Sequence, residues 1–238
     1  AQLNIDQMME EMYATTTASK SACPSPDDYM KSFEGADNII VVTITGTLSG
    51  SYNSAEIAKK IYLEEHPDTK IHVIDSLSAG GEVDLLVRKL NHLVAEGLEF
   101  DQVLDAITAY QAKTKLLFVL AKVDNLVKNG RLSKLVGTVV GLLNIRMVGE
   151  ASMTGTLELL QKARGQKKAI KAAFDELIKA GYTGGHITIA HRNNDKFIEH
   201  FSELVRKKFA HAGIETLPTS GLCSFYAEEG GLLMGYEI

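Results

Sequence analysis

Two apolar runs in the first half of the chain restrict the possible folds more than any other feature. Residues 38–45 (NIIVVTIT) and 71–75 (IHVID) are rich in β-branched side chains, as in strands that are buried on both faces of a parallel sheet. Each run is followed by a loop with glycine or hydroxyl side chains, and then by a segment with helical periodicity. This alternation predicts a parallel sheet that is flanked by helices, which is an α/β domain.

The second half of the chain has a different organisation. Its strand-like runs lie at 116–122, 145–152, 156–163, 186–191, 214–217 and 231–236. Amphipathic segments at 166–180 and 195–209 predict two helices, and Ser133 is a plausible N-cap for another helix through 135–142. Because several strands follow one another without a helix between them, we expect an α+β domain with an antiparallel sheet.

We expect the boundary between two domains near residue 113. Residues 1–112 then form the N-terminal α/β domain, which carries the candidate loops, and residues 113–238 form the C-terminal α+β domain. A doubly wound domain normally begins with a strand, whereas this chain begins with the helix-like segment MMEEMY at 8–13. We therefore expect that a first strand of the domain is missing from the printed sequence.

Composition excludes several classes of protein. The chain carries a net charge of −5 and lacks the strongly basic character of nucleic-acid-binding proteins. No run approaches the roughly 18 apolar residues that span a bilayer, so no stable membrane insertion is expected. Two cysteines are too few for a disulfide framework, and the seven histidines show no metal-binding spacing. These features favour a cytoplasmic protein without a metal or another cofactor.

The loop after the first apolar run is the strongest candidate site. Ser49 and Ser51 lie in TGTLSGS at 45–51, where the carboxyl end of a parallel strand opens into a crevice. Their hydroxyls and the N–H groups of the following helix are suited to an anion. The loop matches no phosphate-binding glycine motif, and Thr47 replaces the first glycine of a nucleophile elbow. The alternative is an ordinary turn that is capped by Ser51.

Two further loops lie where they can line the same crevice. SKSACPSP at 19–26 is rich in hydroxyls, and DSLSAGG at 75–81 follows the second apolar run. The loop at 19–26 is more readily interpreted as a connector between two elements, and Asp75 is equally well interpreted as a helix cap. Cys23 has no histidine nearby in the sequence to act as its base. An acyl-ester hydrolase that uses Ser49 or Cys23 therefore stays a weaker hypothesis, as does a small-anion or metabolite-sensing module.

Several segments together resemble the DegV family of bacterial fatty-acid-binding proteins. ITGTLSGSYNSA at 44–55 resembles the family's I-S-S-x-L-S-G-T-Y-x-S-A, and SACPSP at 21–26 stands where the family has T-S-Q-P-S-P. Four more segments match family motifs in the same order: VIDSLSA at 73–79, DNLVKNGRL at 124–132, GLLNIR at 141–146 and KARG at 162–165. Together they extend over most of the chain.

The resemblance implies a long-chain fatty acid in an apolar tunnel between two domains. In characterised members, a separate ATP-using fatty-acid kinase phosphorylates the bound acid, and the binding protein contributes no catalytic residue. By position, Ser49 and Ser21 would donate hydrogen bonds to the carboxylate, and Gly50 belongs to the same loop as Ser49. Arg131 matches the arginine of the family's K-G-G-R segment.

The chain departs from the family pattern near its C-terminus. Where the family often reads G-T-H-x-G-P-G, Tyr226 replaces the histidine and Glu228 replaces a glycine. Tyr226 is therefore a further candidate ligand-binding residue. The carboxylate of Glu228 would disfavour an anionic headgroup unless it is protonated or turned outward.

Overall fold

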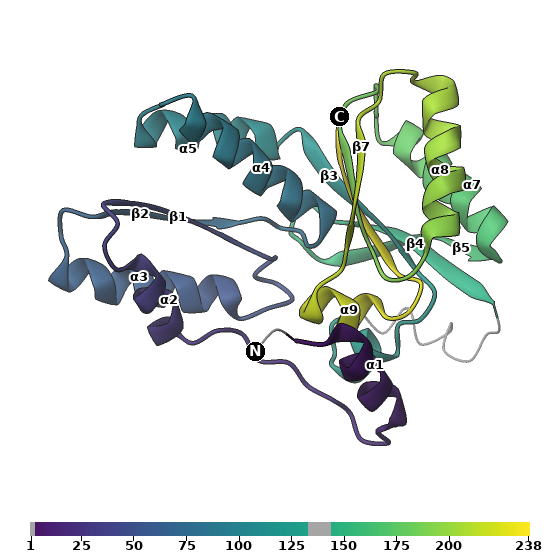
Figure 1. The fold of residues 1–238 in the computed structure, drawn as a ribbon, viewed down its shortest axis with the longest axis horizontal. Helices are drawn as coiled ribbons and strands as arrows, with labels where there is room; N and C mark the ends of the chain where they lie inside the picture. The colour runs from purple at the N-terminus through teal and green to yellow at the C-terminus, as the bar shows by residue number, and fades with distance from the viewer. Residues whose placement is uncertain (1–2, 133–143) are drawn as a thin grey trace.

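The computed structural model describes residues 3–132 and 144–238 of the chain (Figure 1). The helix that we expected through residues 135–142, with Ser133 as its N-cap, lies outside the described residues. Within them, the strands form a small parallel sheet and a larger mixed sheet. This mixed α/β architecture confirms the predicted fold class.

The small sheet pairs β1 (Asn38–Thr43) with β2 (Lys70–Asp75) in parallel. One face is covered by α2 (Pro26–Phe33) and α3 (Ser51–Glu65), and the other by α4 (Gly81–Ala95) and α5 (Phe100–Gln111) (Figure 1). The strands are apolar on both faces because each face packs against helices. The alternation of strands and helices that the sequence predicted is confirmed.

The larger sheet has the strand order β5-β4-β3-β8-β6-β7. Its strands are β3 (Thr114–Leu120), β4 (Ile145–Ala151), β5 (Leu157–Arg164), β6 (Ile187–His191), β7 (Ile214–Pro218) and β8 (Leu232–Glu237). Neighbouring strands are antiparallel except for β6 and β7, which pair in parallel. The helix α8 (Asp195–Lys208) connects these two strands, and such a crossover returns the chain in the same direction. The sheet is therefore mainly antiparallel, as expected, and the parallel pair of β6 and β7 makes it a mixed sheet.

The two faces of the larger sheet have different coverings. The helices α7 (Gln166–Lys179) and α8 pack on one face over a large apolar core. Because side chains alternate along a strand, Leu116, Phe118 and Leu120 of β3 point to the opposite face. That face is approached by two short helices, α6 (Asp124–Lys128) and α9 (Gly221–Ala227). The sequence indicated a helical turn at α6 but not the helix α9.

The helix α4 connects the two sheets physically. It packs against β1 of the small sheet and against β8 and β6 of the large one. The contact with the large sheet is close, because a Cβ atom on Gly81 would lie 2.7 Å from the backbone nitrogen of Gly235. The helix α4 belongs to the first 112 residues and yet packs against both sheets. The expected domain boundary after residue 112 therefore stays a prediction.

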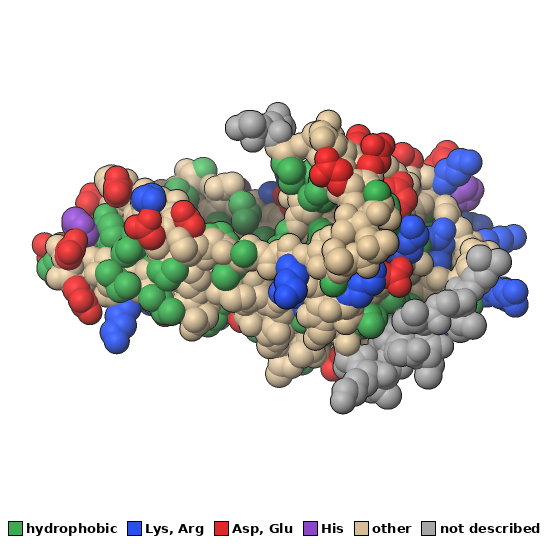
Figure 2. All heavy atoms as spheres, turned by 90° about the horizontal axis from the view of Figure 1, so that it is seen from below, with side chains coloured by type: hydrophobic (Ala, Val, Ile, Leu, Met, Phe, Trp, Pro, Cys, Tyr) green, Lys and Arg blue, Asp and Glu red, His purple; other side chains and the backbone are tan. Residues whose placement is uncertain are grey.

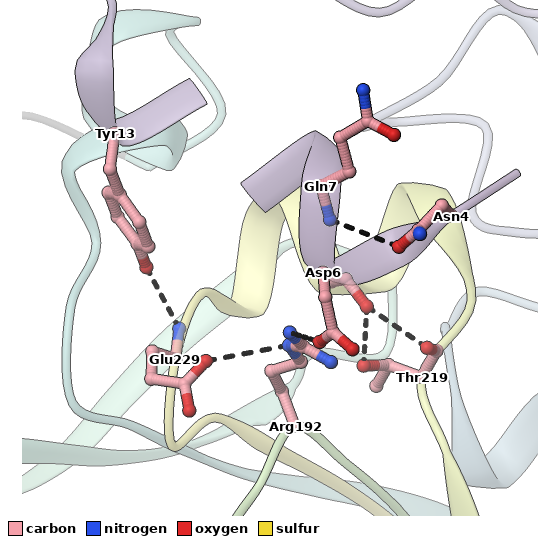
Figure 3. Close-up of polar contacts among 8 residues, drawn as sticks. Asn4, Asp6, Gln7, Tyr13, Arg192, Thr219 and Glu229 are labelled. Carbon is pink, nitrogen blue, oxygen red and sulfur yellow. Dashed lines mark hydrogen bonds and ion pairs between the residues drawn. The ribbon is translucent and has the colours of Figure 1, made fainter. Parts of the chain in front are cut away.

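The first helix, α1 (Ile5–Ala14), packs against α9. Figure 3 shows the polar contacts that hold it there: the carboxylate of Asp6 pairs with Arg192, and the hydroxyl of Tyr13 accepts a hydrogen bond from the backbone of Glu229. Met9 is its one buried residue. The α1 helix thus covers the outer side of α9.

The lobe that carries α2 and α3 has apolar side chains at its surface (Figure 2). On α3, Ile57 and Ile61 are more than one third exposed.

No helix among the described residues is long and apolar enough to cross a membrane.

Candidate functional site

An apolar cavity lies between the first candidate loop, α9 and the face of the larger sheet that carries Phe118. It encloses about 690 Å³, including its opening to solvent. Leu116, Phe118 and Leu120 of β3 line it from the sheet, together with Leu157 of β5 and Leu233 of β8. The opposite side is built by Ile44, Leu48, Ala79, Leu126, Leu222, Cys223 and Ala227. Such a lining is suited to a hydrocarbon chain.

The structure brings four of the five predicted site residues to this cavity. Ser21, Ser49, Arg131 and Tyr226 all line it, although they come from four different parts of the chain. Tyr226 contacts both Ser21 and Arg131, and apart from Thr45 the rest of the lining is apolar. A ligand with a long apolar body and one polar end matches this distribution.

Ser21 and Tyr226 contact each other directly. The hydroxyl oxygens of the two residues lie 2.9 Å apart, within hydrogen-bonding distance. Ser21 precedes α2, whereas Tyr226 lies on α9. This bond therefore ties the second hydroxyl-rich loop to the helix that forms one wall of the cavity.

Arg131 connects the turn after α6 to the first candidate loop. Its Nε donates a hydrogen bond of 2.9 Å to the carbonyl oxygen of Leu48, and Nη1 donates one of 3.2 Å to Asn129. The guanidinium also lies 4.9 Å from the ring centroid of Tyr226, which is a favourable cation–π distance. Arg131 thus places a positive charge beside the hydroxyls of the cavity.

Ser49 is held by a local turn at the start of α3. Its oxygen accepts a hydrogen bond from the backbone N–H of Ser51 at 3.2 Å and lies 2.9 Å from the hydroxyl of Ser51. The Ser49 hydroxyl can therefore still donate its own hydrogen. The N-cap of α3 is Gly50, and no side chain caps the helix. The alternative interpretation of this loop, an ordinary turn capped by Ser51, is therefore wrong about the capping residue.

Gly50 lies in the first hydroxyl-rich loop, next to the second one, and is not part of the lining of the cavity. A Cβ atom at this position would lie 3.0 Å from the sulfur of Cys23. Position 50 therefore lies close to the second loop. Cys23 is exposed, and neither Cys23 nor Ser49 has a hydrogen bond to a histidine among the described residues.

The third loop has a mainly structural function. The carboxylate of Asp75 accepts hydrogen bonds from the backbone N–H groups of Gly46, at 3.1 Å, and Leu77, at 2.9 Å. Asp75 does not line the cavity, whereas Ala79 from the same loop does. Asp75 thus fixes the first and third loops relative to each other.

Glu228 is buried but directed away from the cavity. It is 1% exposed, it is not a lining residue, and its carboxylate accepts a hydrogen bond of 3.0 Å from the backbone N–H of Asn125. Burial raises the pKa of Glu228, and the bond from Asn125 opposes this shift. The carboxylate therefore does not face the ligand position, which removes the conflict expected from the sequence.

The contribution of α9 to the cavity wall was not predicted from the sequence. Leu222 and Cys223 line the cavity beside Tyr226, and their spacing of three to four residues is the only signal that they share a helical face. Burial raises the pKa of the Cys223 thiol. The residue therefore acts as an apolar wall group and not as a nucleophile.

A family model and many known proteins match this chain. Residues 1–236 match the model described as an uncharacterised protein of the DegV family. A DegV domain-containing protein from Streptococcus gordonii is 76% identical over 238 residues, which is 100% of this chain and 85% of the relative. A relative of the same description from Streptococcus pyogenes serotype M1 is 64% identical over 236 residues, covering 99% of this chain and 84% of the relative.

Solved structures with bound fatty acids are also similar to this chain. One is the Streptococcus pneumoniae Fatty Acid Kinase (Fak) B3 protein loaded with linoleic acid, with a TM-score of 0.98 and 76% identity over 100% of this chain and 85% of that one. Another is a DegV family protein from Eubacterium eligens loaded with heptadecanoic acid. Its TM-score is 0.95, with 38% identity over 99% of this chain and 86% of that one.

Proposed function

The chain belongs to the DegV family, and we propose from this that it binds a long-chain fatty acid in the apolar cavity and presents the carboxylate to a partner kinase. The observation that carries the proposal is the position of Ser21, Ser49, Arg131 and Tyr226 on a cavity wall that is apolar elsewhere except at Thr45. The acyl chain lies along the floor formed by β3, and the carboxylate lies among the hydroxyls.

The energetics of this arrangement are favourable. Each methylene removed from water contributes roughly 0.8 kcal/mol, so a chain of about 16 carbons supplies around 12 kcal/mol before ordering costs. Burying a carboxylate without hydrogen-bond donors would cancel much of this gain. The hydroxyls of Ser21, Ser49 and Tyr226 and the charge of Arg131 supply charge-assisted partners.

We assign the chemistry of phosphorylation to the kinase and a non-catalytic function to this chain. Ser49 bonds to Ser51 and not to a base, so it lacks the activation that a nucleophile needs. Ser21 and Ser49 are partly exposed, which keeps a bound carboxylate accessible to a second protein. We place this transfer in the cytoplasm, where a kinase finds ATP.

The test is fatty-acid binding by the purified protein and by Ser49→Ala. Lipid extraction and mass spectrometry should identify a co-purified fatty acid, and calorimetry with that acid should show about tenfold weaker binding by Ser49→Ala, because a hydrogen bond to a charged group is lost. Ser32→Ala is a matched control, since the hydroxyl of Ser32 bonds to the backbone of Asp28 on exposed α2. Absence of fatty-acid binding by the unmodified protein would contradict the proposal.

The same preparations separate this function from its two alternatives. Hydrolysis of a chromogenic acyl ester that disappears in Ser49→Ala would identify an esterase. Tight binding of a short carboxylate such as acetate, without any gain from a longer chain, would identify a small-anion module. Either result would overturn the fatty-acid proposal.

A further inference from the structure

Phe118 lies on the floor of the cavity, directly opposite a glycine on the neighbouring strand. In the antiparallel pairing of β3 and β4, Phe118 is the partner of Gly149. Both residues are buried, and Phe118 lines the cavity. The pairing of β4 with β5 shifts register between Val148 and Gly149, which marks a β-bulge at this point.

The ring of Phe118 occupies the space that a side chain at position 149 would need. A Cβ atom on Gly149 would overlap Cζ of Phe118 and would lie 2.7 Å from Cε2. Carbon atoms do not approach so closely, so any side chain at position 149 would displace the ring. The ring therefore leans onto β4, and Gly149 is the residue that permits this position.

We propose that Gly149, acting through Phe118, sets the width of the acyl cavity and thereby its preference between bent and straight acyl chains. This inference rests on the proposed fatty-acid binding. A cis double bond bends an acyl chain, and a bent chain needs more lateral room at the same depth than a saturated one. Because the ring of Phe118 lies against β4, the cavity above the ring keeps the lateral room that a bent chain needs. Phe118 is then the specificity-determining contact, and Gly149 is its positioning residue.

The experiment compares linoleic acid with stearic acid, which have equal chain length but different shape. Calorimetry on Gly149→Ala should show the affinity for linoleic acid falling by about fivefold relative to that for stearic acid, because the lifted ring overpacks the cavity. In the double variant Gly149→Ala/Phe118→Leu, no ring is left to be lifted. Its ratio of the two affinities should therefore equal that of Phe118→Leu alone to within about twofold.

A second variant keeps the proposal testable if Gly149→Ala does not fold, since its Cβ atom would also overlap the backbone oxygen of Glu158. Phe118→Leu alone should widen the floor and raise the affinity for linoleic acid relative to stearic acid by about threefold. The matched control is Phe201→Leu, because Phe201 is fully buried against the opposite face of the same sheet. This control should leave the ratio of the affinities for linoleic and stearic acid unchanged.

The outcomes separate the inference from the function on which it rests. If the unmodified protein binds neither acid, the proposed function and this inference both fail. If it binds them and every folded variant at positions 118 and 149 keeps the same ratio, only the inference fails. A change of the ratio in Phe201→Leu equal to that in Phe118→Leu would also overturn it, because the effect would then not arise at the cavity floor.

Discussion

The hydroxyl of Ser21 and the phenol of Tyr226 share a hydrogen bond of 2.9 Å, although 205 residues separate them in the sequence. The bond joins the loop before α2 to the helix α9 at the cavity. The ring of Tyr226 is in turn covered by the guanidinium of Arg131. Three candidate residues from separate parts of the chain thus form one contact network.

Tyr226→Phe should weaken fatty-acid binding by about three- to tenfold. The substitution keeps the ring beneath Arg131 but removes the hydroxyl that Ser21 contacts, and one hydrogen bond contributes about 1 kcal/mol. Isothermal titration calorimetry measures the effect. Tyr182→Phe is the control, since its hydroxyl donates to Gly185 beside the core on the opposite face of the sheet. Equal affinities of Tyr226→Phe and the unmodified protein would show that this hydroxyl does not serve the ligand.

Arg131→Lys should lower both the thermal stability and the affinity, even though it keeps the charge. A lysine cannot hold the carbonyl of Leu48 and lie flat on the ring of Tyr226 at once. We expect a loss of about 1 kcal/mol in the free energy of unfolding, measured by urea denaturation of the ligand-free protein. Arg88→Lys, which alters an exposed ion pair on α4, should change neither quantity measurably. Wild-type behaviour of Arg131→Lys would mean that the charge alone matters.

Asp75→Ala should destabilise the protein by about 1–3 kcal/mol, because the backbone N–H groups of Gly46 and Leu77 lose their acceptor. Asp75→Asn should lose less, since its amide oxygen still accepts a hydrogen bond. Chemical denaturation of the three proteins gives this order of stabilities. The reverse order, with Asn less stable than Ala, would show that the loops do not depend on this acceptor.

Glu228→Gln should stabilise the protein at pH 8 and lose this advantage as the pH falls toward 5. Burial raises the pKa of Glu228 above its usual value of 4.5, so the folded state binds this proton more tightly than the unfolded chain does. The stability linked to this proton is complete below the unfolded pKa and is lost as the pH rises through the folded pKa. A glutamine keeps an acceptor for Asn125 without a buried charge. Thermal melts of both proteins across this range measure the difference, and a constant difference would contradict the assignment.

The order of helices and strands was largely predictable because it depends on local patterns. Buried strands such as β1 and β2 are recognisable as β-branched runs, and α8 is recognisable from its apolar stripe. The seven residues of α9 carry no such signal. A helix this short is stable only through its packing, which no local pattern records.

The candidate site was predictable as residue types but not as an arrangement. The hydroxyl-rich loop around Ser49 identified polar groups suited to an anion, whereas the fatty acid and the functions of Ser21 and Arg131 came from the family resemblance. That these groups share one cavity with Tyr226 depends on the pairing of β3 with β8 and on the position of α9. The direction of the Glu228 carboxylate and the contact between Gly149 and Phe118 likewise arise from segments far apart in the chain. Backbone periodicity operates over a few residues, whereas the shape of a cavity is set by side chains that meet only after the sheet has formed.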